Sequence, residues 1–165
     1  MPRVALISDT HIPSRKETIP EWVVEEIEAA DYTIHAGDFD SVDAFERVGE
    51  IAGETLTACL GNTDPGDLEL PAVATLDVAD IRFVVTHGQG DPETYKQRVA
   101  AIATEHGAGT TIGVSGHTHR VHDEVVDGVR LLNPGSATGA APALTATMLV
   151  VSIDGDAVSV SRIDG

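Results

Sequence analysis

The stretch VALISDTH, residues 4–11, decides the fold. Residues 4–8 are short, apolar and rich in β-branched side chains, a pattern typical of a strand buried on both faces. Asp9 and His11 follow where that strand is predicted to end. Because ligands of open α/β sheets bind at the carboxyl ends of the strands, this stretch predicts an α/β protein with its site at a sheet edge.

The pattern continues outward as alternating strands and helices. An amphipathic helix is predicted over 20–30, a strand over 32–35, a helix over 41–48 and a strand over 56–60, which together form a βαβαβ half. The second half is rich in strands: 74–78 and 81–86 as a hairpin, then 111–115 after a helix from Asp91-Pro92 to about His106. Two further hairpins are predicted to turn at Asp127-Gly128 and Asp154-Gly155. These elements indicate a two-sheet α/β sandwich with helices on the outer faces.

The amino-acid composition limits the classes of function that the protein can have. The 165 residues fit a single domain, 1–165. The net charge of −17 comes from 27 acidic against 10 basic residues, so a stable nucleic-acid complex, which requires basic tracks, is not expected. Acidic residues spread along the whole chain resemble the surfaces of proteins from salt-accumulating archaea, and we expect a halophilic archaeal source. A monomer and a homo-oligomer are both compatible with the sequence.

The single cysteine, Cys59, excludes an intramolecular disulfide and is predicted to fill a buried strand. No apolar run has the length of a signal peptide or of the ~20 residues of a membrane span. We therefore expect a cytoplasmic protein with no membrane partner.

Polar residues of metal-binding types recur just after the predicted strands. The set comprises two carboxylates, one amide and four imidazoles: Asp9, Asp38, Asn62, His11, His87, His117 and His119. Within an extended segment, alternate residues point the same way, so the Asp9/His11 and His117/His119 pairs can each address one centre. Seven donors exceed the needs of one tetrahedral zinc and suit two metals with a bridging carboxylate.

The motifs SDTH at 8–11, GD at 37–38, GN at 61–62, TH at 86–87 and GHTH at 116–119 resemble those of calcineurin-like metallophosphoesterases. Within that superfamily the chain is most similar to small single-domain archaeal and bacterial phosphodiesterases, which close with an NPGS loop, here 133–136. The resemblance implies a four-layer α/β/β/α sandwich of two mixed sheets flanked by helices. It assigns one metal to Asp9, His11, Asp38 and His119, and the other to Asp38, Asn62, His87 and His117.

The resemblance further implies hydrolysis of small phosphodiesters, activated aryl or nucleotide esters, by in-line attack of a metal-bridging hydroxide. Asp38, Asn62 and His87 are the predicted catalytic residues. Imidazole-rich ligands favour transition metals, Mn²⁺ first, with Ni²⁺, Fe²⁺, Co²⁺ and Zn²⁺ as alternatives. Two divalent ions less two ligand carboxylates predict a local charge of about +2, which attracts a phosphate ester. A phosphomonoesterase or nucleotide phosphatase is the alternative enzyme, and a metal-free protein-binding scaffold of the same fold is the alternative outside enzymes.

Two departures from the family pattern bear on proton transfer. Thr63 stands where many members carry a histidine that protonates the leaving oxygen, and Gln89 replaces a second histidine. Asp64 is predicted to be a loop cap. Outside the motifs, we expect His35 to be a packed partner of the site, Ser136 to shape its rim, and His106 and His122 to lie at the surface. Arg15 and Arg120 are expected to be solvated, and contact with a phosphate is the alternative for both.

Overall fold

Ten strands, three α-helices and three short 3₁₀ helices follow one another in the computed structural model, which describes residues 1–165. The α-helices are α1 (Glu21–Ala29), α2 (Val42–Ala52) and α3 (Tyr95–His106), and the 3₁₀ helices are η1 (Gly53–Thr55), η2 (Gly66–Leu68) and η3 (Pro92–Thr94). The strands are β1 (Arg3–Ile7), β2 (Tyr32–His35), β3 (Leu56–Ala58), β4 (Val73–Val78), β5 (Ile81–Thr86), β6 (Thr110–Val114), β7 (Val121–Val126), β8 (Val129–Pro134), β9 (Thr147–Asp154) and β10 (Ala157–Asp164).

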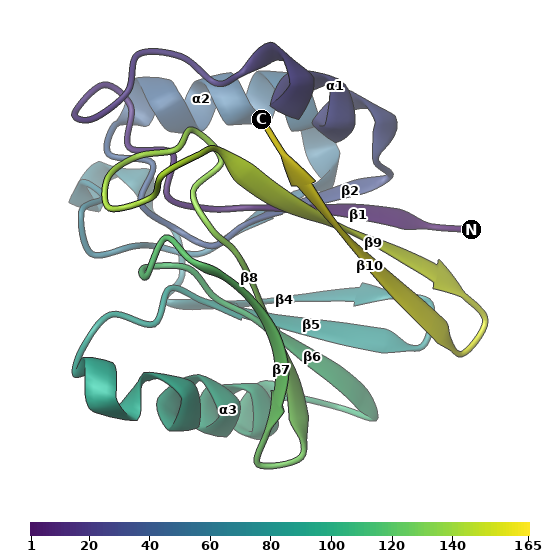
Figure 1. The fold of residues 1–165 in the computed structure, drawn as a ribbon. Coiled ribbons are helices and arrows are strands. Elements are labelled where there is room, and N and C mark those ends of the chain that lie inside the picture. The colour runs from purple at the N-terminus through teal and green to yellow at the C-terminus, as the bar shows by residue number, and fades with distance from the viewer.

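The strands form two five-stranded mixed sheets that pack face to face. The first has the order β10-β9-β1-β2-β3 and the second β4-β5-β6-β8-β7. Helices α1 and α2 cover the outer face of the first sheet, and α3 covers that of the second (Figure 1). The predicted four-layer α/β/β/α sandwich is therefore confirmed.

Strand β1 shows why the layers form. Its side chains alternate between the two faces of the sheet, as strand geometry requires. Val4 and Leu6 belong to a cluster of 15 buried residues that includes side chains of the second sheet, such as Phe83. Ala5 and Ile7 belong to a second cluster of 12, which also includes the helical residues of α1 and α2. Because both faces are covered, a continuous apolar strand is stable here.

Element ends follow local capping and turn chemistry. Ser41 caps α2 by accepting a hydrogen bond from Ala44 N, and the helix continues to Ala52, past the predicted end at 48. Val126 pairs with Val129, so the β7–β8 hairpin turns at the predicted Asp127-Gly128. In the β9–β10 hairpin, Asp154 pairs with Ala157, which moves the turn one residue on to Gly155-Asp156. There Gly155, at φ +60°, supplies the left-handed position that the turn requires.

The C-terminal hairpin returns to the first sheet. Strand β9 pairs antiparallel with β1, although β8, which precedes it, lies in the second sheet. The connection spans residues 135–146 and passes over the carboxyl end of β1, where Ala137 N donates to Ser8 O. Cys59 is fully buried, as predicted. None of the three α-helices has the length and apolar character needed to cross a membrane.

Candidate metal centre

The seven predicted ligand residues lie together where the carboxyl ends of strands from both sheets meet. The strands that precede them are β1 for Asp9 and His11, β2 for Asp38, β3 for Asn62, β5 for His87, and β6 for His117 and His119. Most of these side chains are buried, whereas Asn62 is exposed and His117 partly so. The opening of the site therefore lies on the side of Asn62 and His117.

The ligand atoms form two neighbouring groups, each with its atoms within 4.8 Å of one another: Asp9, His11 and His119; and Asp38, His87 and His117. This is the division that the resemblance implies. Asp38 Oδ2 lies 3.0 Å from His87 Nε2 and 3.5 Å from His11 Nε2, so its carboxylate faces both groups. Asn62 Oδ1 lies 3.2 Å from His117 Nδ1 and adds an amide oxygen to the second group.

Hydrogen bonds on the far side of the imidazoles define which nitrogen carries the proton. The Nδ1 of His119 lies 2.8 Å from Ala140 O, and a carbonyl can only accept, so this Nδ1 is protonated. The Nδ1 of His11 lies 2.9 Å from Asp40 Oδ1, which likewise favours a proton there. In the neutral rings both Nε2 atoms then carry lone pairs, and they face each other at 3.2 Å. A cation bound by both nitrogens removes this repulsion.

A carboxylate oxygen at the centre of the site lacks any hydrogen-bond partner. Asp9 Oδ1 is inaccessible to solvent and unpaired. It faces the Nε2 atoms of His119, His11 and His87 at 3.3, 3.7 and 3.8 Å. His87 Nδ1 lies 2.7 Å from Ala36 O, so the Nε2 of this ring also presents a lone pair. A buried unpaired carboxylate oxygen costs free energy unless a cation satisfies it, and these residues therefore fit a metal.

The pKa values of the site residues also indicate that the site attracts positive charge. Burial would raise the pKa of Asp9, but the imidazoles of His11, His119 and His87 around its carboxylate outweigh burial and hold this pKa well below its usual value. Burial would lower the pKa of His87, but the carboxylates of Asp38 and Asp9 raise it above the ordinary value. The site thus stabilises ionised carboxylates and attracts cations.

The backbone at the site is unusual, because five of the seven residues have left-handed φ angles between +46° and +74°: Asp9, His11, Asp38, His117 and His119. The prediction that these segments are extended is therefore wrong. The turns send His117 and His119 to different groups, whereas Asp9 and His11 still share one. Such strained residues concentrate at functional sites. Gly61 is required by close approach, since a Cβ there would overlap Asp38 Oδ1.

Two acidic residues support the ligands, and the sequence indicated a role for only one of them. Asp64 caps the loops, as predicted: its carboxylate accepts from the backbone N–H groups of Gly61 at 2.8 Å, Asp40 at 2.9 Å and Asp38 at 3.0 Å. Asp40 was missed, although it accepts the hydrogen bond from His11. The spacing Gly-Asp-x-Asp at 37–40 was the available signal.

These carboxylates change the charge expected at the centre. Asp40 contacts the ring of His11 and Asp64 contacts the backbone of Asp38, so two further carboxylates lie next to the ligands. The predicted local charge of about +2 counted the ligands alone, and these two neighbouring carboxylates would lower it. Basic side chains around the opening would then add to the attraction of an anionic substrate.

The loop after β6 is held by Tyr95, which the sequence did not single out, and by residues of the NPGS loop. Tyr95 donates its hydroxyl to Gly116 O at 2.6 Å, and Asn133 donates its amide to the same carbonyl at 3.0 Å. Ser136 donates to Asp9 O at 2.7 Å and is fully buried, so its predicted place at the rim is wrong. The NPGS loop thus fixes the backbone of the site from behind.

Other expectations have mixed outcomes. His35 is fully buried, stacks on Phe39 at 3.6 Å between ring centroids and accepts from Gly37 N at 3.1 Å, as predicted for a packed partner of the site. His122 is half-buried with its ring 6.1 Å from that of Tyr95, so it is less exposed than predicted. His106, Arg15 and Arg120 are exposed, as predicted.

No histidine takes the position of the missing proton donor. The backbone N–H of Thr63 donates to Asp38 Oδ1 at 2.9 Å, and its hydroxyl donates to Asp40. Both carboxylate oxygens of Asp64 accept backbone hydrogen bonds and are directed at the loops. Neither residue is therefore arranged to protonate a leaving group.

The fold and the site define a metalloprotein class: a four-layer α/β sandwich whose strand ends carry two adjacent Asp/His ligand groups. A model of the calcineurin-like phosphoesterase superfamily domain matches residues 3–156, and the chain belongs to that superfamily. A probable metallophosphoesterase of Methanothermobacter thermautotrophicus is 34% identical over 155 residues, which cover 93% of this chain and 87% of that protein.

Two further relatives differ in what their names describe. A phosphodiesterase of Methanocaldococcus jannaschii is 27% identical over 152 residues, covering 83% of this chain and 85% of that protein. The crystal structure of a double mutant of Vps29 from Entamoeba histolytica superposes with a TM-score of 0.78 at 20% identity, covering 99% of both chains. The second similarity shows the fold alone.

Proposed function

We propose that the protein is a dinuclear-metal phosphoesterase that hydrolyses small phosphodiesters. The observation that carries this proposal is the pair of ligand groups, with the Asp38 carboxylate facing both. Asp9, His11, Asp38 and His119 would hold one ion, and Asp38, Asn62, His87 and His117 the other. When bound, two such ions supply charge neutralisation and an activated water for attack on phosphorus. We infer Mn²⁺ as the native metal from the imidazole-rich ligand set.

The surrounding residues have roles that follow from their contacts. Asp40 and Ala140 hold the rings of His11 and His119 so that both Nε2 atoms face the centre. Thr63 N donates to Asp38 Oδ1, which leaves Oδ2 directed at the imidazoles. Because no acid is positioned beside the site, the leaving oxygen departs with its negative charge, and activated esters are the best substrates.

The protein should therefore lose hydrolysis of bis(p-nitrophenyl) phosphate when treated with a chelator and regain it with added Mn²⁺. Asp38→Asn should lower kcat/KM by about 10²-fold or more, because it weakens the carboxylate that faces both groups. Full activity of Asp38→Asn would refute the proposal. Thr55→Ala provides a matched control, since Thr55 bonds only Ala52 O, away from the ligands.

Metal binding separates the enzyme from a protein-binding scaffold of this fold. Metal content of the purified protein and Mn²⁺ binding by calorimetry report on the ligand groups without reference to activity. An enzyme of the proposed type binds about two ions per chain. A protein that binds none and hydrolyses no phosphoester would favour the scaffold.

A further inference from the structure

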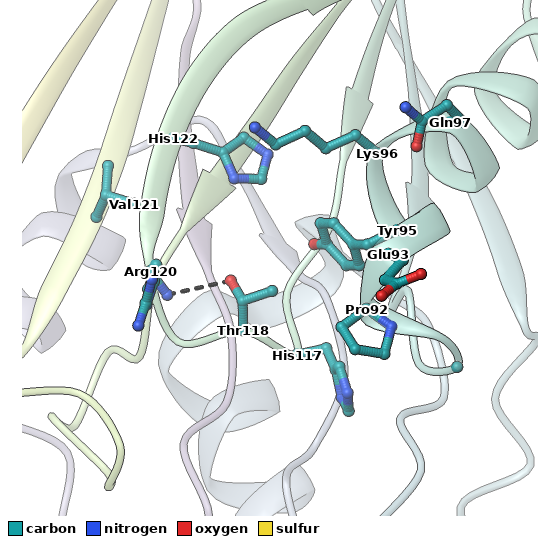
Figure 2. Close-up of a pocket in the computed structure, with 11 residues that line it drawn as sticks. Pro92, Glu93, Tyr95, Lys96, Gln97, His117, Thr118, Arg120, Val121 and His122 are labelled. Carbon is teal, nitrogen blue, oxygen red and sulfur yellow. Dashed lines mark hydrogen bonds between the residues drawn. The ribbon is translucent and has the colours of Figure 1, made fainter.

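A pocket of about 480 Å³ opens beside the candidate metal centre. Its lining includes His117 of the second ligand group and side chains of η3, α3 and β7. Figure 2 shows His117 at one end of the pocket and Lys96 with His122 at the other, while Arg120 stands across from Glu93. The volume is typical of small-molecule sites and accommodates an aryl or nucleoside group.

Arg120 at this pocket is unlike the other basic residues of the chain. Of the ten basic side chains, six form ion pairs with carboxylates. Arg120 is the one arginine whose guanidinium makes neither a hydrogen bond nor an ion pair, and it directly follows His119. A free arginine on a protein with 27 acidic residues, next to the ligands, indicates a group kept available for an anion.

The pocket is also less acidic than the protein as a whole. Lys96 and Arg120 line it against the carboxylate of Glu93. Lys96 is also paired at 2.6 Å with Glu124, which is not part of the lining, so the guanidinium of Arg120 is the free cation of the pocket on a protein with a net charge of −17. The ligand carboxylates of Asp9 and Asp38, together with Asp40 and Asp64 next to the ligands, offset the charge of two divalent ions, so Arg120 adds local attraction for an anion and the ion-paired Lys96 adds less. Guanidinium groups bind carboxylate and phosphate oxygens in pairs, which suits Arg120 to a planar anionic group.

We propose that this pocket binds one ester group of the substrate and selects phosphodiesters in which that group carries a second anion, such as another phosphate or a carboxylate. This inference rests on the proposed function. The scissile phosphate would lie at the open side of the centre, beside Asn62 and His117, with its ester group directed toward Arg120 and Lys96. Arg120 also lines a second hollow, of about 560 Å³, with Arg162 and the buried His119. We favour the first pocket because His117 is accessible from it.

The test compares two p-nitrophenyl diesters that differ by one charge: phenyl p-nitrophenyl phosphate and 4-carboxyphenyl p-nitrophenyl phosphate. The Mn²⁺-loaded protein should hydrolyse the carboxylated ester with a kcat/KM about fivefold higher, mostly through a lower KM. Arg120→Ala should remove most of that preference, and Lys96→Ala a smaller part. Both side chains are exposed, so the variants should fold.

Two control variants distinguish this pocket from the second hollow and from a general effect of surface charge. Glu124→Gln breaks the 2.6 Å ion pair with Lys96 but keeps the ammonium, so the preference should be at least as large as in the unmodified protein. Arg162→Ala alters only the second hollow and should also keep it. Equal KM values for the two esters, or a preference lost in Arg162→Ala but kept in Lys96→Ala, would overturn the inference. Failure to hydrolyse either ester would refute the proposed function itself, and this inference with it.

Discussion

Replacing Asp64 by alanine tests whether one carboxylate holds the loops of the metal centre together. It accepts hydrogen bonds from the backbone N–H groups of Gly61, Asp38 and Asp40 at 2.8–3.0 Å. A hydrogen bond to a charged group contributes about 1.5 kcal/mol or more, and the half-buried position of Asp64 favours the lower part of that range. We expect Asp64→Ala to lower the free energy of unfolding by about 4–5 kcal/mol, and Asp64→Asn by about 2 kcal/mol because one accepting oxygen remains.

A second effect should appear in metal binding. Asp64 contacts the backbone of Asp38 and of Gly61, which precedes Asn62, so its loss displaces two predicted ligands. Removal of such supporting contacts typically weakens metal affinity about 10- to 100-fold. Urea unfolding of the chelator-treated protein measures the first effect, and calorimetric titration with Mn²⁺ measures the second. Asp67→Ala is the control, since Asp67 is exposed in η2. A stability loss below about 1 kcal/mol with unchanged Mn²⁺ affinity would refute the reasoning.

Three other predictions follow from the site, the surface and the core. Without a positioned acid, log(kcat/KM) should fall steeply as the leaving-group pKa rises across aryl and alkyl phosphodiesters. Thr63→His should make this slope shallower. A flat line for the unmodified protein would show that another residue acts as the acid. With 27 acidic residues and only six Lys/Arg–carboxylate pairs, lowering salt from 3 M to 0.1 M should lower the melting temperature by more than about 5 °C, and a salt-independent value would contradict the halophilic interpretation. Burial lowers the pKa of His35 to about 3, so the unfolded chain binds the proton first and stability falls as pH drops below 6.5. The stability advantage over His35→Gln in urea unfolding should then shrink by about 1.3 kcal/mol between pH 5.5 and 4.5, and an advantage constant over that range would disprove the assignment.

The sequence predicted the elements well where a local pattern was sufficient. Residues 32–35 and 81–86 are strands with the predicted bounds, and the β7–β8 turn lies at Asp127-Gly128, as predicted from that dipeptide. Alternation, apolar runs and turn residues act over a few positions, so they can be read without knowledge of the partners. The β9–β10 turn was placed one residue early, because strand pairing, not the Asp-Gly dipeptide, set its register.

The candidate ligands were also accessible from the sequence, because each follows a strand and carries a metal-binding group. What was missed lies in contacts between distant segments. Asp40 meets His11 across 29 positions, and Tyr95 reaches Gly116 across 21. Neither residue stands in a motif with its partner, so only their approach in the fold identifies them as supports.

The sequence by itself determined that apolar strands end in seven metal-binding side chains, since strand character and ligand chemistry are local properties. Only the tertiary structure decided which of those side chains belong to each of the two ligand groups. Left-handed turns at His117 and His119 send neighbouring histidines to different groups, and the return of β9 to β1 carries the NPGS loop behind Asp9. The arrangement of acids and a free cation, with Asp40 and Asp64 next to the ligands and Arg120 at the opening, was likewise decided by the fold. Electrostatic energy depends on distance and solvent exposure, which a linear sequence does not contain.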